Sequence, residues 1–184
     1  MKPETDILPI GPLMIEHRLI ERVVTLLEKE LARIREGNQV NAFFLTSAID
    51  FFKVYADRCH HGKEEDIFFD DLQKKMLSPE DKTMIENLKQ DHVRSRELVG
   101  KLAGDVQESS RQPNAEISKT IAADIEDLVK LYKVHIGKED KEFFIPVMKY
   151  LSKEEQDGML CRFWEFDRLL IHEKYKNIVA QFEA

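Results

Sequence analysis

The chain has 184 residues, of which 42% are hydrophobic and 34% are charged, with only seven glycines and six prolines. This length is enough to bury one sizeable core, and few turn residues among many charged ones are typical of a helical protein. The formal net charge of −7 disfavours a nucleic-acid partner, because an acidic surface repels the phosphate backbone. No segment approaches the roughly 20 consecutive apolar residues that cross a bilayer, so we expect no membrane partner.

The N-terminal segment and the cysteine content favour a cytoplasmic protein. Residues 1–11 lack the basic and then apolar order of a signal peptide. Cys59 and Cys161 are too few for a disulfide framework, which secreted small proteins commonly need. We therefore expect a reduced, cytoplasmic setting.

Capping residues and helix breakers divide the sequence into five helical segments. Pro12 suits a first helical turn, and Gly37 suits a helix end. Ser78 precedes a proline and two acids, which is the pattern of a capped helix start. Ser152, with a glutamate three residues later, forms a capping box. Pro146 is expected to end or kink the fourth segment. The segments run over residues 12–37, 41–76, 79–108, 114–150 and 152–184.

The arrangement of these segments predicts the fold class. Sustained two-residue alternation and Asn-Gly or Asp-Gly hairpin signals are absent from the sequence, which argues against strands. We predict an all-α protein, an up-and-down four-helix bundle with an additional C-terminal fifth helix. Residues 1–184 are expected to form a single domain, with an N-terminal arm at 1–11, the bundle at 12–150 and the C-terminal helix at 152–184.

Residues spaced by three and four mark the inner face of each of the first four segments. Each of these four stripes contains one histidine, and two of them contain a glutamate one turn later. The stripes are Leu13, His17, Ile20, Val24, Leu27, Leu31 and Ile34; Leu45, Ile49, Phe52, Ala56, His60, Glu64 and Ile67; Ile85, Leu88, His92, Ser95, Val99, Leu102 and Val106; and Ile121, Ile125, Leu128, Tyr132, His135 and Glu139.

The interior histidines and glutamates together indicate a metal site. A single histidine on an apolar face is usually a core residue with a hydrogen-bond partner, but histidine makes up only 6 of 184 residues and four helices each place one inside. A buried carboxylate must be paired or must bind a cation. Imidazole and carboxylate are ligands that iron, manganese and zinc accept. The candidate ligands are His17, His60, Glu64, His92, His135 and Glu139.

The second and fourth segments resemble each other. The block His60–Phe69, HHGKEEDIFF, aligns without a gap with the block His135–Phe144, HIGKEDKEFF. Both histidines of the first block have a glutamate four residues later. Only the pair that begins at His60 has a counterpart in the second block and lies on the inner stripe. We therefore predict His60 as a ligand, and His61 as a residue that supports the ligands or lies on the surface.

Four strings carry a resemblance to a known family. The strings are LMIEHRLIERV, HHGKEEDIFF, KQDHVRSREL and HIGKEDKEFFIP. About residues 11–150 resemble the hemerythrin-like, or HHE cation-binding, domain. The resemblance implies a four-helix bundle around two iron ions, Fe²⁺ or Fe³⁺, joined by carboxylates and a bridging oxo or hydroxo group. The six candidate ligands match the family pattern, with Glu64 and Glu139 as the bridges. Manganese or zinc would be tolerated by the same set.

The sequence departs from the oxygen-carrying members of that family. They have a second histidine one turn after the histidine of the third helix, where this chain has Arg96. They also use a carboxylate five residues past the fourth-helix histidine, where Asp140 stands, although Glu139 fits the internal repeat better. The missing ligand could be solvent, an exogenous ligand or Glu21, one turn after His17.

Further residues have two interpretations each. Tyr132 is either a core aromatic or a donor that contacts the bound ligand, and Arg96 either pairs with a carboxylate near the site or lies on the surface. The fifth segment carries a stripe that either covers one side of the bundle or forms a homodimer interface. That stripe is Cys161, Trp164, Arg168, Ile171, Tyr175, Ile178 and Phe182, and His172 beside it is expected to be exposed.

Three functional hypotheses follow. The leading one is a cytoplasmic, non-haem di-iron protein that binds dioxygen or a related small ligand for sensing, storage or stress response, rather than an enzyme. The second is a di-iron enzyme or repair factor that handles peroxide or nitric oxide, or that donates iron to iron–sulfur clusters. The third is a regulatory module in which iron loading controls binding to a partner.

Overall fold

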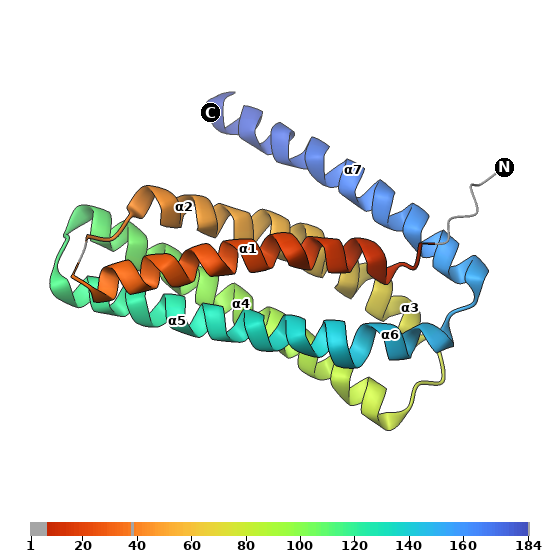
Figure 1. The fold of residues 1–184 in the computed structure, drawn as a ribbon. Helices are drawn as coiled ribbons and strands as arrows, with labels where there is room; N and C mark the ends of the chain where they lie inside the picture. Colours follow the sequence, from red (N-terminus) through yellow and green to blue (C-terminus); the bar gives the residue numbers. More distant parts are fainter. Residues whose placement is uncertain (1–6, 38, 184) are drawn as a thin grey trace.

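The computed structural model describes residues 7–37 and 39–183, with side chains as far as Leu170. The regular structure of this part is helical and contains no strand, as predicted (Figure 1). The elements are α1 (Ile10–Arg35), α2 (Ala42–Phe51), η1 (Phe52–His61), η2 (Glu64–Phe69), α3 (Asp70–Gln73), α4 (Pro79–Arg111), α5 (Ala115–Lys138), η3 (Glu139–Phe143), α6 (Phe144–Val147), η4 (Met148–Tyr150) and α7 (Lys153–Glu183).

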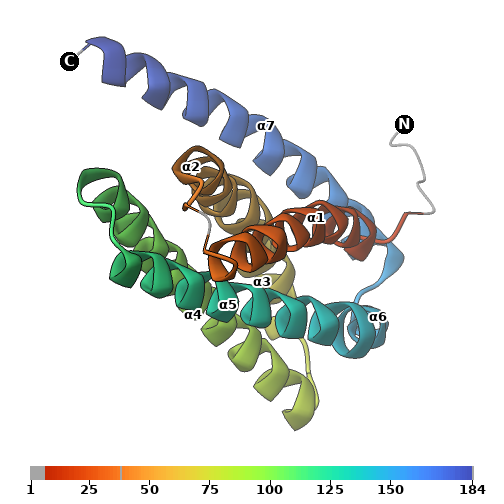
Figure 2. The same cartoon turned by 60° about the vertical axis from the view of Figure 1, so that its left-hand side comes forward.

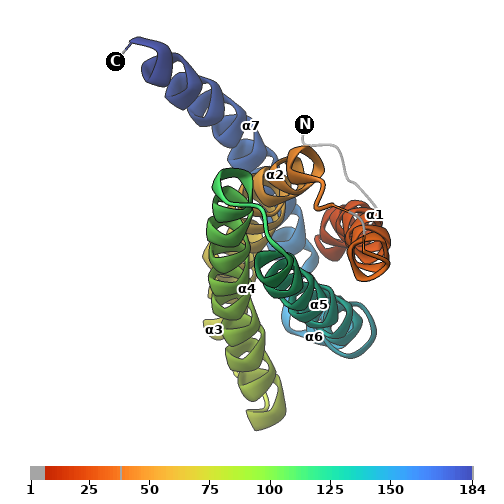
Figure 3. The same cartoon turned by 90° about the vertical axis from the view of Figure 1, so that its left-hand side faces the viewer.

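These elements join into four long rods and a fifth helix. The elements α2, η1, η2 and α3 form the second rod, and α5, η3, α6 and η4 form the fourth. Figure 3 looks onto the end of the bundle where α1 joins α2 and α4 joins α5. In Figures 1 and 2, α7 lies outside the four rods, on the side of α1 and α2. None of the described helices is long and apolar enough to cross a membrane.

The helix ends follow the predicted capping chemistry. The Ser78 hydroxyl accepts a hydrogen bond from the Asp81 amide at the start of α4. At the start of α7, the Ser152 hydroxyl accepts from the Glu155 amide, and the Glu155 carboxylate accepts in return from the Ser152 amide. Gly37 has a φ of 86°, in the left-handed region that favours glycine, and it follows the end of α1.

Every residue of the four predicted inner stripes is buried. The buried hydrophobic residues form two clusters, and the polar candidate ligands lie between them along each rod. In α1, His17 lies between Leu13 of one cluster and Ile20 of the other; in α4, His92 lies between Leu88 and Leu98. The candidate site is therefore closed at both ends by apolar packing, which keeps bulk water away from it.

The inner face of α7 differs from the prediction. Cys161, Trp164 and Arg168 are exposed, whereas Leu160 and Phe163 are buried against the bundle. The predicted stripe was therefore wrong by about one residue in this part of the helix, because the face of a helix that packs on a bundle is set by the docking angle. The side chains of the other predicted residues lie outside the described part, namely Ile171, His172, Tyr175, Ile178 and Phe182.

The close approach of α7 to the second rod depends on a glycine. The ring of Phe166 packs directly on Gly62, where an added Cβ would lie 2.7 Å from the ring edge. Because any side chain at this position would meet the ring, Gly62 lets α7 rest on the backbone between η1 and η2.

Candidate metal centre

The second rod departs from α-helical geometry where its histidines lie. Both η1 and η2 are π-helical, with a wider turn and therefore a smaller rotation per residue than the roughly 100° of an α-helix. Two consecutive residues can then both face the interior. His60 and His61 are each only 1% exposed, so the prediction that His61 could lie on the surface was wrong.

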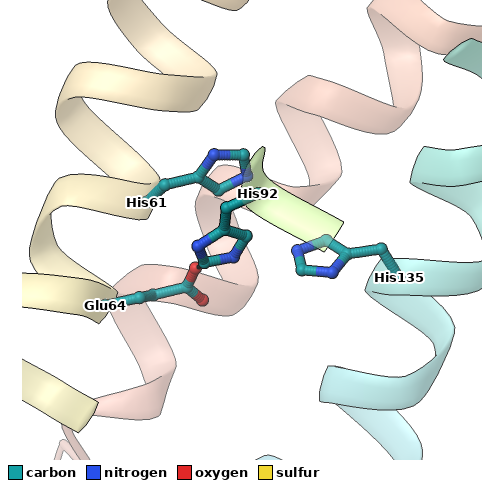
Figure 4. A group of neighbouring side chains, drawn as sticks. All are labelled: His61, Glu64, His92 and His135. Carbon is teal, nitrogen blue, oxygen red and sulfur yellow. Dashed lines mark ion pairs between the residues drawn. The ribbon is translucent and has the colours of Figure 1, made fainter. Parts of the chain in front are cut away.

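Ligand-type side chains gather in two adjacent groups inside the bundle. Within each group, one ligand atom per residue lies within 4.8 Å of all the others. Site 1 contains His17, His60, Glu64 and Glu139, and site 2 contains His61, Glu64, His92 and His135. Figure 4 shows site 2, with His61 and Glu64 reaching in from the second rod, His92 from α4 and His135 from α5.

The two glutamates lie between the two sites. Glu64 belongs to both groups, and its two carboxylate oxygens lie 3.4 Å from His60 Nε2 in site 1 and 3.4 Å from His92 Nε2 in site 2. Glu139 Oε2 lies 3.2 Å from His17 Nε2 and 3.2 Å from His135 Nε2. Neighbouring ligand atoms around one ion with bonds near 2.1 Å are about 3.0–3.4 Å apart. These four spacings lie in that range, and His17 Nε2 and His60 Nε2 of site 1 lie slightly closer together, at 2.8 Å.

Unsatisfied buried atoms concentrate at these two sites. In the described part of the chain, eleven buried side-chain nitrogen or oxygen atoms have no hydrogen-bond partner, and nine of them belong to His61, Glu64, His92, His135 and Glu139. Buried polar atoms normally have partners, since leaving one without costs about 1–3 kcal/mol. Seven of the nine are Nε2 or carboxylate oxygen atoms, which bound cations would satisfy together, whereas His61 Nδ1 and His135 Nδ1 lie 3.5 Å from Asp57 and Asp91. The residues present therefore fit a metal.

Each of the five histidines has a carboxylate beside its Nδ1 atom. Such a carboxylate fixes the imidazole so that Nε2 presents its lone pair to a metal, and it makes the ring a stronger ligand. The pairs are His17 with Asp140 at 2.8 Å, His60 with Glu16 at 2.9 Å, His92 with Glu65 at 2.7 Å, His61 with Asp57 at 3.5 Å and His135 with Asp91 at 3.5 Å.

Each of these five carboxylates forms an ion pair with a basic side chain. Arg96 stands where the oxygen carriers have the second histidine of the third helix, and it forms 2.7 Å contacts with both Asp57 and Glu65. It therefore supports His61 and His92 from outside, which confirms the interpretation that it pairs with carboxylates near the site. The remaining contacts are Arg18 with Asp140, Lys63 with Glu16, and Lys138 with Asp91.

The pKa shifts of three histidines and of Glu64 suit a cation site, whereas the shift of His17 makes metal binding compete with a proton. Burial, together with repulsion from neighbouring histidines, lowers the pKa values of His60, His61 and His92 well below 6.5, so these rings are neutral at pH 7. Burial lowers the pKa of His17, but hydrogen bonds to Asp140 and Glu139 outweigh this effect and raise it to about 9, so this ring would release a proton when a metal binds. Burial and the nearby Glu139 raise the pKa of Glu64 well above 4.5. A cation would relieve this repulsion between carboxylates.

The structure brings all six predicted ligands together, and it adds His61. Glu21 does not join them: its side chain is 45% exposed and pairs with Arg18, so the hypothesis that it completes the coordination was wrong. Tyr132 lies beside site 2, with its ring centroid 6.2 Å from that of His61 and its hydroxyl 2.8 Å from Ser95 Oγ.

The sequence contained a signal for His61, but it was indirect. The chain lacks the second histidine of the third helix, where Arg96 stands, and carries an extra histidine next to His60. In space the extra histidine stacks on His92 of the third rod, with ring centroids 3.9 Å apart, so His61 lies beside the helix that lacks its second histidine. The internal repeat concealed the role of His61, because Ile136 stands at the corresponding position of the second block.

These observations define a helical bundle with a buried histidine and carboxylate cluster that suits cations. The hemerythrin HHE cation-binding domain matches residues 8–145, and the chain belongs to this family. No curated protein and no solved structure matches the chain. The family match ends before α7 begins at Lys153, so the C-terminal helix is an addition to the matched segment.

Proposed function

We propose that this chain is a non-haem di-iron protein of the cytoplasm that binds dioxygen or a related small ligand, for sensing, storage or stress response. The observation that carries the proposal is the set of seven buried Nε2 and carboxylate oxygen atoms without a hydrogen-bond partner, at two adjacent sites that share Glu64. Two iron ions would supply redox chemistry and free coordination positions for such a ligand. Zinc or manganese could occupy the same ligand set.

The residues would divide unequally between the two ions. His17 and His60 would serve site 1, whereas His61, His92 and His135 would serve site 2, with Glu64 and Glu139 between them. Site 1 would thus have one protein ligand fewer. We propose that an incoming small ligand binds at site 1, while the five carboxylate partners hold the histidines in place and the apolar clusters exclude water.

The protein's reaction with dioxygen tests this proposal. Anaerobic reconstitution with iron(II) should give two irons per chain, and exposure to dioxygen should produce a visible charge-transfer band that disappears under vacuum. Less than one iron per chain after careful reconstitution would refute the di-iron proposal. Irreversible bleaching with turnover of peroxide would instead support the enzyme hypothesis.

A substitution of Tyr132 tests whether a residue that lies beside the ligands contributes to stability alone or also to metal binding. Its side chain is 2% exposed, and it forms part of the lining of a cavity of about 340 Å³ that also borders Glu21. Tyr132→Phe removes the hydroxyl that contacts Ser95 and keeps the ring. We expect a loss of about 1 kcal/mol in unfolding free energy and two metals still bound, measured by urea denaturation and metal analysis. Loss of a metal would contradict this expectation and would support the other interpretation of Tyr132, a donor to the bound ligand.

A further inference from the structure

Glu16, the carboxylate beside His60, differs from the other four carboxylates in that its basic partner is buried. The cations that contact Asp140, Asp57, Glu65 and Asp91 all reach the surface, since Arg18, Arg96 and Lys138 are 54%, 39% and 30% exposed. Glu16, beside His60, is held by Lys63, whose side chain is fully buried. A buried ammonium needs more than one oxygen partner to offset its loss of hydration.

The second partner of this lysine comes from the C-terminal helix. Asp167 of α7 lies 2.8 Å from Lys63 Nζ, and the same carboxylate oxygen accepts a hydrogen bond from the Cys59 thiol at 3.2 Å. Glu16, Cys59 and Asp167 lie close enough together to bind a metal. Here the Lys63 ammonium, which pairs with Glu16 and Asp167, supplies the positive charge. An unbroken polar chain runs from α7 to a candidate ligand.

The helix is held at this point by packing as well as by charge. Phe163 is 1% exposed, and Phe166 packs on Gly62, between the π-helical elements that carry His60, His61 and Glu64. Asp167 follows Phe166 directly in the sequence. The contact that docks α7 therefore also sets the position of the Asp167 carboxylate over Lys63.

We propose that α7 is a functional part of the metal centre, and that Asp167 is a positioning residue that acts through Lys63 and Glu16 on His60. This inference rests on the proposed function, in which His60 is a site 1 ligand. It assigns a role to a helix that lies outside the segment matched by the family.

The physical reason is the sharing of one ammonium between two carboxylates. While Asp167 takes part of the Lys63 charge, Glu16 keeps enough negative charge to accept strongly from His60 Nδ1. Without Asp167, Lys63 draws Glu16 toward itself, so His60 is held less firmly and becomes a weaker ligand. By thermodynamic reciprocity, a metal at site 1 must strengthen the docking of α7 by the same factor.

Zinc binding to full-length protein tests the first half of this coupling. Zn²⁺ accepts the same ligand types and has no redox chemistry. We expect Asp167→Asn to weaken one of two calorimetric zinc sites about ten-fold, at the lower end of the effect of losing an outer partner. Asp167→Glu should restore most of the affinity. Glu165→Gln is the matched control, because Glu165 pairs with Arg168 on the exposed side of the same helix, and it should bind zinc as the wild type does.

Tryptophan fluorescence tests the reciprocal half. Trp164 is the single tryptophan of the chain, and it is 53% exposed on α7 close to Asp167. Zinc should change its emission in the wild type and in Glu165→Gln, and the change should be largely lost in Asp167→Asn at saturating zinc. An emission that does not respond to zinc in the wild type would overturn the coupling.

A double-mutant cycle tests the route through the lysine. If Asp167 acts through Lys63, then Asp167→Asn should add almost nothing in a Lys63→Met background; additive losses would overturn the route. Two zinc sites of wild-type affinity in Asp167→Asn would show that α7 only covers the bundle. A wild-type protein that binds no metal would instead refute the proposed function itself, so the two failures are distinguishable.

Discussion

His61→Ala is expected to reduce metal binding from two ions per chain to one. The side chain provides one of the three imidazoles of site 2 and none of those of site 1. Loss of an outer partner of a ligand typically weakens a metal site by about 10–100-fold, and loss of a ligand should weaken it further. Metal content at limiting metal, together with a two-site calorimetric titration, would measure the effect.

Two further variants show whether this loss is specific to site 2. His60→Ala should remove the other site and leave site 2 filled, so the two variants should lose different titration steps. Lys53→Ala changes an exposed residue of the same π-helical element and should keep both ions. Two ions of wild-type affinity in His61→Ala would contradict the assignment of this histidine to site 2.

Glu64→Gln is expected to stabilise the metal-free protein and to abolish metal binding. Both oxygens of Glu64 are buried without a hydrogen-bond partner, close to Glu139. A glutamine of the same shape carries no charge and can donate to Glu139, so we expect a gain of about 1–3 kcal/mol in metal-free unfolding free energy. The wild type should overtake the variant when metal is added, since a ligand at a thousand times its Kd stabilises by about 4 kcal/mol.

Chemical denaturation with chelator and with zinc would detect this reversal in the order of stability. Glu65→Gln is the matched control, because Glu65 accepts from His92 and contacts Arg96 rather than facing the sites. It should destabilise the protein in both conditions. A Glu64→Gln variant that is less stable than the wild type without metal would mean that Glu64 has a structural role.

Without metal, the difference in unfolding free energy between Glu64→Gln and the wild type should also depend on pH. The folded chain raises the pKa of Glu64 above the usual 4.5. The wild type therefore keeps its stability below pH 4.5 and loses it as the pH rises and the buried carboxyl is forced to ionise. The advantage of Glu64→Gln should be small in acid and grow toward neutral pH. A constant difference across this range would contradict the cause assigned to the shift.

The sequence by itself determined the bundle and most of the candidate site. The spacing of apolar residues by three and four identified inner faces that are all buried in the structure, from Leu13 in α1 to Glu139 at the start of η3. Such patterns predict burial well, because an α-helix has a fixed period and one face of each rod must meet the others. The same pattern placed an interior histidine on each of the four rods.

Tertiary structure decided what depends on a broken period or on partners that are distant in sequence. The π-helical turns brought His61 inside, and no α-helical period could predict this. The carboxylates beside the histidines come from far along the chain, as Asp140 does for His17, so their roles appear only when the rods are packed.

The docking of α7 was decided in the same way. Its contact face follows from a glycine that admits Phe166 and from a buried lysine that needs Asp167, 104 residues away in sequence (from 63 to 167). The local sequence of α7 specifies a helix and its cap. Only the packed bundle specifies where that helix rests, because the position depends on the shape and charge of the surface that receives it.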